Sequence, residues 1–171
     1  MVILETKRLQ LAEVTLDDAP FFVELMNSPH WVEFIGDRHI RTIDDAKAHL
    51  KKTILKSYAD NGYGFYKVQL KKEGLKTIGI CGIVKRKELE DTDIGFGFLP
   101  AYEGRGYGYE SSKGIMELAK ERFHLDRIAA ICVASNKNSI HLIKKLGLVY
   151  QNKIKPFEDD SELLLFVKNL K

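Results

Sequence analysis

Apolar and polar residues alternate in several short segments of the chain, and this pattern predicts a set of strands. Residues from Arg8 to Val14 alternate with a period of two, as expected of a strand whose successive side chains face opposite sides of a sheet. The segment from Arg127 to Val133 is almost entirely apolar, which is typical of a strand buried on both faces. The pattern predicts strands at residues 8–14, 65–70, 77–84, 93–99, 127–133, 148–150 and 161–167.

Helices are predicted where capping residues precede apolar side chains spaced three to four apart. Thr15 and Thr42 are the expected N-caps of the first two helices, and Gly147 is expected to end the last one in a left-handed conformation. The helices are predicted over residues 16–27, 44–58, 110–123 and 136–146. Between the first two, residues 30–38 show no clear period. The order βααβββαβαββ is typical of a mixed α/β (α+β) sheet with helices on its faces, in a single domain over residues 1–171.

Composition narrows the class of protein. The chain has 171 residues, of which 44% are hydrophobic and 30% charged, as in a globular domain with a core. No apolar run approaches the ~20 residues that a membrane helix needs, so no membrane partner is expected. The net charge of +3 is too small to indicate a nucleic-acid partner.

The N-terminal residues and the cysteines point to the cytoplasm. Residues 1–6 contain no basic region followed by an apolar stretch, so we expect no signal peptide. Cys81 and Cys132 lie in apolar strand-like runs and are expected to be buried free thiols of a reducing compartment. Neither the cysteines nor the five histidines have the spacing of metal ligands, and no metal is expected.

Three glycines at alternate positions stand between the predicted strand 93–99 and the predicted helix 110–123. Gly104, Gly106 and Gly108 allow positive φ angles and leave no side chain to keep a ligand away. A helix N-terminus adds unpaired N–H groups and the positive end of a dipole. Together these features predict an anion-binding turn, most naturally for phosphate. A connector without a ligand is the alternative, and a P-loop is disfavoured because no Gly-Lys-Ser/Thr is present.

This turn and the helix after it resemble the GNAT superfamily of acyl-CoA-dependent N-acyltransferases. The family's Gln/Arg-x-x-Gly-x-Gly/Ala motif corresponds to residues 103–108, with Glu103 as a departure at its first position. A second motif, Asn-x-x-Ser before a helix that ends in Lys-Leu-Gly-Phe, corresponds to residues 136–139 and 145–148. The form Pro-x-Tyr-x-Gly-x-Gly-Tyr resembles the branch of the ribosomal-protein N-terminal acetyltransferases. The order of elements also matches, so the resemblance covers nearly the whole chain.

The resemblance implies a central mixed, mostly antiparallel sheet of seven strands, splayed between strands 93–99 and 127–133, with four helices on its faces. It implies acetyl-CoA as co-substrate, with the pyrophosphate on the glycine turn and the pantetheine arm paired like an added strand. Asn136 would bond the pantetheine amides, or would only cap its helix. The implied cofactor-binding residues are Phe98, Leu99, Gly104, Arg105, Gly106, Tyr107, Gly108, Tyr109, Asn136 and Ser139.

The implied reaction is direct attack of an amine on the thioester, in a ternary complex. Many family members protonate the leaving thiolate from a tyrosine at the position that Ile143 occupies here. By resemblance to the ribosomal-protein branch, Ser139 is the replacement, with Tyr150 as a distant second; capping of the helix is the other role open to Ser139. Asp93, Glu33 and Asp37 are the candidates for the catalytic base, and each could instead be a solvated acid.

Residues 30–38 connect the first two helices and are expected, by resemblance, to overhang the amine site. Trp31, Phe34, Glu33 and Asp37 are the expected substrate wall, with a plug over the core as the alternative. The acceptor is a small-molecule amine or a protein N-terminus, and the protein is a monomer or a homodimer. Because Ile143 replaces the usual tyrosine, a non-catalytic CoA-binding or sensing domain is the alternative function.

Overall fold

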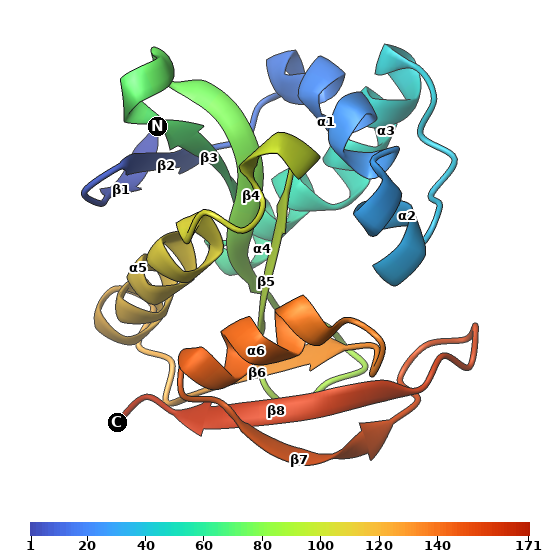
Figure 1. The fold of residues 1–171 in the computed structure, drawn as a ribbon, viewed down its shortest axis with the longest axis vertical. Helices are drawn as coiled ribbons and strands as arrows, with labels where there is room; N and C mark the ends of the chain where they lie inside the picture. Colours follow the sequence, from blue (N-terminus) through green and yellow to red (C-terminus); the bar gives the residue numbers. More distant parts are fainter.

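The computed structural model describes all 171 residues as one open sheet of eight strands with six α-helices and three short 3₁₀ turns (Figure 1). The strands are β1 (Val2–Glu5), β2 (Leu9–Glu13), β3 (Phe65–Leu70), β4 (Lys76–Val84), β5 (Asp93–Phe98), β6 (Arg127–Cys132), β7 (Val149–Ile154) and β8 (Leu163–Asn169). The helices are α1 (Ala19–Met26), α2 (Pro29–Phe34), α3 (Ile43–Lys52), α4 (Ile54–Asn61), α5 (Tyr107–Glu121) and α6 (Lys137–Lys145). None of these helices is both long and apolar enough to cross a membrane.

The sheet consists of two antiparallel halves that meet at a single point. Its strand order is β1-β2-β3-β4-β5-β6-β8-β7, and every neighbouring pair is antiparallel except β5 and β6. The parallel pair β5 and β6 is joined only at Asp93 and Ala129. Beyond that point the two strands diverge toward the C-terminal end of β5. The predicted mostly antiparallel, splayed sheet is therefore confirmed, and the splay leaves one edge of β5 without a partner strand.

The sheet has eight strands and not the predicted seven, because β1 was missed. Only four residues long, β1 pairs with β2 through a register that shifts between Val2 and Leu4. Its position depends on a distant helix: the Leu4 side chain lies against Gly114 of α5, where an added Cβ would come within 3.1 Å of Leu4 Cδ1. So short a segment carries too little alternation to be recognised from the sequence alone.

The helices are also more divided than predicted. A 3₁₀ turn over residues 16–18, capped by Thr15, precedes α1, and the predicted second helix is broken at Thr53, whose ψ of −87° is not helical. The segment from His30 to Arg38, predicted to be irregular, begins as the short helix α2, with Pro29 in its first turn. The structure thus has six helices where four were predicted. The predicted order of the longer elements is otherwise the observed one.

The longest helix, α5, begins three residues before its predicted start. Gly106 is its N-cap and has a φ of +83°, a left-handed conformation that favours glycine. The helix packs against β4 and β5, and Ile115 and Ala119 of its inner face are buried in the core. This packing carries the glycine turn to the C-terminal end of β5, where the two halves of the sheet have separated (Figure 1).

Candidate functional site

A cleft of about 480 Å³ opens where β5 and β6 diverge. Its walls are α2, the end of β5, the connection from β5 to α5 and one face of α6. The structure brings together residues of all three predicted groups in this cleft. Those that line it are Trp31, Phe34, Phe98, Gly104, Gly106, Tyr107, Gly108, Tyr109, Asn136 and Ser139.

The glycine turn forms the floor at one end of the cleft. Gly104 and Gly106 have φ angles of +72° and +83°, which side chains other than glycine rarely adopt. At Gly108 an added Cβ would lie 3.0 Å from Leu142 Cδ2 of α6, so the helices approach closely there. The N–H groups of the first turn of α5 have no partner within the helix and stand at the positive end of its dipole. The turn therefore has the chemistry of an anion site.

Two of the predicted cofactor-binding residues, Leu99 and Arg105, do not line the cleft. The side chain of Leu99 is buried in the core; its N–H donates to the Ile78 carbonyl at 2.9 Å and its carbonyl accepts from Tyr102 at 2.9 Å. These main-chain groups, predicted to be exposed to a ligand, are used within the protein. Arg105 is exposed and does not line the cleft, and its guanidinium carbon lies 5.5 Å from the centre of the Tyr102 ring.

Asn136 and Ser139 stand side by side at the start of α6. Asn136 is the N-cap, and its Oδ1 accepts a hydrogen bond from the Ser139 N–H at 3.2 Å. Capping is therefore the work of Asn136, and the hydroxyl of Ser139 is not needed for it. The Ser139 hydroxyl interacts with the Cys132 thiol, an interaction that partly offsets the rise in the pKa of Cys132 caused by burial. The usual tyrosine position, Ile143, lies fully inside the core.

Asp93 is buried at the closed end of the splay and does not line the cleft. Burial raises the pKa of Asp93 to about 6, and the Arg86 guanidinium, whose Nε lies 3.0 Å from Oδ1, offsets part of this rise. The carboxyl group is therefore easier to protonate than an exposed aspartate. Strand β5 spans roughly 17 Å from Asp93 to Phe98 at the usual strand rise, and the glycine turn begins beyond its end.

The two other predicted carboxylates lie outside the cleft. Glu33 is exposed on α2 and makes no ion pair. Asp37 is bound by the Arg41 guanidinium through two hydrogen bonds of 3.0 and 2.6 Å, and accepts a third from the His39 N–H. These contacts, chiefly the one with Arg41, lower the pKa of Asp37 to about 2. A carboxylate held so strongly in its ionised form is a weak base at neutral pH.

The wall opposite the turn is made by α2. Its Trp31 ring lies against β5 at Gly97, where an added Cβ would come within 2.6 Å of Trp31 Cζ3. The indole Nε1 is buried and has no hydrogen-bond partner. His30 of the same helix pairs with Glu103 of the turn, with Nδ1 and Oε2 2.7 Å apart. This pair links the two walls across the cleft.

Several residues that line the cleft are not marked by the sequence. His30 and Glu103 were not recognised as a pair, because nothing in a single sequence connects positions 73 residues apart. Four further residues lie on one face of α6, and their spacing of three and four residues is the sequence pattern that could have predicted this. They are Asn138, His141, Leu142 and Lys145. Lys145 Nζ lies 4.3 Å from the centre of the Tyr109 ring, so it is held beside the first turn of α5.

Comparisons with known proteins agree on one family. The family model described as the acetyltransferase (GNAT) domain matches residues 8–149. A Bacillus subtilis (strain 168) protein named uncharacterized N-acetyltransferase YnaD is 28% identical over 145 residues, which cover 85% of this chain and 81% of that protein.

The solved structures show the same fold. An acetyltransferase from Agrobacterium tumefaciens str. C58 superposes with a TM-score of 0.80 at 22% identity, covering 96% of this chain and 92% of that one. RimL, a ribosomal L7/L12 alpha-N-protein acetyltransferase solved with coenzyme A, superposes with a TM-score of 0.78 at 15% identity, covering 99% and 98%. The splayed sheet is thus the GNAT fold, and the chain belongs to the GNAT acetyltransferase family.

Proposed function

We propose that the protein transfers an acetyl group from acetyl-CoA to a primary amine by direct attack in a ternary complex. The observation that carries the proposal is the cleft itself, where a helix N-terminus with a glycine turn adjoins the unpaired edge of β5. The turn suits the pyrophosphate, and the strand edge suits the amide groups of the pantetheine arm. RimL was solved with coenzyme A and the immunity acetyltransferase MccE with acetyl-CoA, and both share this fold.

Acetyl-CoA would be held by residues of the glycine turn, the edge of β5 and the start of α6. The first-turn N–H groups of α5 would donate to the pyrophosphate, with Arg105 contributing positive charge from outside the cleft. Phe98 would offer its strand edge to the pantetheine. The Asn136 amide nitrogen would donate to a pantetheine carbonyl, since its Oδ1 is already committed to the helix cap.

The reaction needs a base for the ammonium group and a proton for the thiolate. We assign the base to Asp93, because burial raises its pKa to about 6, whereas the contacts with Arg41 and His39 lower that of Asp37 to about 2. None of the three candidate carboxylates lines the cleft, so the proton would reach Asp93 through water.

We assign the delivery of the proton to Ser139, which lines the cleft and is free of the capping role. Its hydroxyl would give a proton to the departing thiolate and take one back from the positively charged nitrogen of the tetrahedral intermediate. A CoA thiol resembles cysteine, with a pKa of ~8.5, so even an unassisted departure costs little at neutral pH.

The acceptor would enter beside α2. Trp31 and Phe34 line the cleft there, and they are the residues we assign to acceptor binding. Primary amines of two kinds fit this proposal, namely small molecules and protein N-termini. Relatives of the same fold are named for both, as a spermidine N-acetyltransferase chimera and as ribosomal-protein acetyltransferases. A cytoplasmic location and a monomeric or homodimeric state stay predictions.

A second function, a non-catalytic CoA sensor, is favoured by one observation: Ile143 fills the usual tyrosine position and is buried in the core. One experiment separates the two functions. Acetyl-CoA affinity is measured by calorimetry, and release of free CoA is then followed with a panel of polyamines, amino sugars and peptides with free N-termini. Release of free CoA with any amine supports the enzyme, whichever residue donates the proton to the thiolate. Binding without release from any amine supports the sensor, and absence of binding contradicts both.

A further inference from the structure

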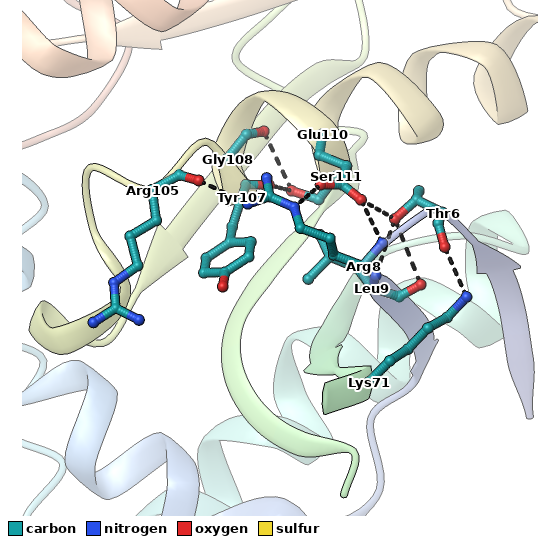
Figure 2. A network of polar contacts seen from close by, with 9 residues as sticks. All are labelled: Thr6, Arg8, Leu9, Lys71, Arg105, Tyr107, Gly108, Glu110 and Ser111. Atoms are coloured by element: carbon teal, nitrogen blue, oxygen red, sulfur yellow. Dashed lines mark hydrogen bonds and ion pairs between the residues drawn. The ribbon is translucent and has the colours of Figure 1, made fainter. Parts of the chain in front are cut away.

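The N-terminal hairpin reaches the glycine turn through the side chain of Arg8, in the connection between β1 and β2 (Figure 2). Its Nη1 donates to the carbonyl oxygen of Arg105 at 3.0 Å. Its guanidinium carbon lies 4.4 Å from the centre of the Tyr107 ring. A Cβ added at Gly106 would come within 3.2 Å of its Nη2. The guanidinium therefore packs against three consecutive residues of the turn, Arg105, Gly106 and Tyr107.

Arg8 also binds Glu110, which lies in the first turn of α5. Arg8 Nε donates to Oε2 at 2.6 Å, and the Arg8 N–H and the Thr6 hydroxyl donate to Oε1 at 2.8 and 2.7 Å. Partial burial alone would raise the pKa of Glu110, but these hydrogen bonds together with the charge of Arg8 lower it. Glu110 is therefore ionised at neutral pH.

The charge of Glu110 bears directly on an anion site. A carboxylate at a helix N-terminus stabilises the helix, yet it opposes a phosphate that binds at the same end. Arg8 cancels this charge, and Thr6 helps to hold the carboxylate on the hairpin side of the turn (Figure 2). The hairpin thus fixes the shape of the turn and also keeps its potential favourable for anions.

We infer that Arg8 is a positioning residue for the pyrophosphate of CoA, acting through the backbone of the turn and through Glu110. This inference rests on the function proposed above, because that function supplies the ligand. Nothing in the local sequence marks Arg8, which lies 97 positions before its partner in the turn.

The test compares two ligands in an Arg8→Met variant, which loses the guanidinium and keeps an apolar stem. CoA affinity, measured by calorimetry, should fall at least tenfold, which corresponds to about 1.4 kcal/mol. Affinity for pantetheine, which carries no phosphate and is titrated at millimolar concentration, should change less than twofold. A role confined to the stability of the fold would not distinguish these ligands, since it would lower both affinities by the same factor.

Two further variants complete the design. Arg8→Lys keeps the charge but cannot reproduce the planar guanidinium with its several donors, so it should weaken CoA binding by about threefold. If Arg8→Met does not fold, the affinities for CoA and pantetheine are compared in Arg8→Lys instead. Lys71→Met is the matched control: Lys71, in the 3₁₀ turn after β3, binds the same hairpin through the Thr6 carbonyl at 2.7 Å and the Glu5 carboxylate at 3.3 Å, and neither partner belongs to the glycine turn. Its CoA affinity should equal that of the wild type.

Wild-type affinity for CoA is measured first, because its absence would overturn the proposed function and not merely the part assigned to Arg8. If the wild type binds CoA and both Arg8 variants bind it within twofold as tightly, the positioning role is wrong. Equal losses for CoA and pantetheine would also overturn it. A selective loss for CoA, with Lys71→Met unchanged, supports it.

Discussion

Two walls of the cleft, the glycine turn and α2, are built in opposite ways. The glycine turn is held from behind by Arg8, and its helix begins with Tyr107 buried in the core and Ser111 hydrogen-bonded to the Tyr107 carbonyl. The opposite wall, α2, has six residues, none of them buried, and its N-cap makes no side-chain hydrogen bond. The polar link between the walls is the His30–Glu103 pair.

This difference matches two kinds of ligand. A turn fixed by side chains from distant segments is organised before binding, which lowers the entropic cost of holding a constant group such as a pyrophosphate. A short, exposed helix with few packed side chains opens and shifts at little cost, which suits acceptors of varied shape. We therefore interpret the turn as the preorganised side of the site, which binds a constant group, and α2 as its adaptable side, which binds varied acceptors.

The largest effect is expected at Asp93, which lies outside the cleft at the point where β5 and β6 still pair. If Asp93 is the base, Asp93→Asn should lower kcat by ~10²-fold or more and abolish the fall in activity that the wild type should show below about pH 6. Kinetics across pH 5 to 9 checks this. Asp91→Asn, which removes a carboxylate paired with Arg127 at 3.1 Å, is the control and should leave the profile unchanged.

Asp93→Asn should also change how the free energy of unfolding depends on pH. Because the folded-state pKa of Asp93 is raised, the folded protein binds a proton more tightly than the unfolded chain between about pH 4 and pH 6. The free energy of unfolding should therefore fall as the pH rises through this window, and Asp93→Asn should remove that fall. A variant that changes stability while kcat and its pH profile stay at wild-type values would leave Asp93 a purely structural role.

Ser139→Ala tests the third wall, α6, and should lower kcat by ~10²-fold if the hydroxyl protonates the thiolate. Acetyl-CoA affinity and thermal stability should change little, because Asn136 and not Ser139 supplies the cap. Steady-state kinetics and thermal melting measure the two quantities separately. A kcat at the wild-type level would remove Ser139 from the mechanism and leave Tyr150 or solvent as the donor.

Gly106→Val tests the organised wall and should weaken CoA binding at least tenfold, or ~1.4 kcal/mol. A valine is strained at a φ of +83°, and its Cβ would meet the Arg8 guanidinium. Gly62→Val is the matched control, since Gly62 has a φ of +77° with open space around it and lies at the C-terminal end of α4. Affinities within twofold of wild type, in a folded protein, would contradict the site.

Trp31→Ala tests the adaptable wall and should have the smallest effect. Loss of the ring should raise the KM for the amine by about fivefold, near 1 kcal/mol, while acetyl-CoA affinity stays within twofold of wild type. Trp31→Phe keeps most of the apolar surface and should lie between. The reverse pattern, with cofactor binding weakened and the amine KM unchanged, would assign α2 to the cofactor and overturn the division between the walls.

Some of this site could be predicted because its signals are local. The glycines of the turn and the capping asparagine are close in sequence to the elements they begin, so the turn and the helix cap follow from backbone geometry alone. The part assigned to Ser139 rests on the family resemblance. The wall residues Trp31 and Phe34 could be placed only through the family resemblance. The main-chain hydrogen bonds of Leu99 could not be predicted, because its N–H donates to the neighbouring strand β4.

By itself, the sequence determined the single mixed α/β domain, the order of its longer elements and the glycine turn before a helix, because hydrophobic period, caps and glycines act within a few residues of one another. Only the tertiary structure decided the eighth strand, the division into α3 and α4, the pairing of His30 with Glu103 and the support that Arg8 gives the turn. These features depend on contacts between segments separated by up to about a hundred residues. Their energies depend on burial and distance, which exist only once the chain has folded.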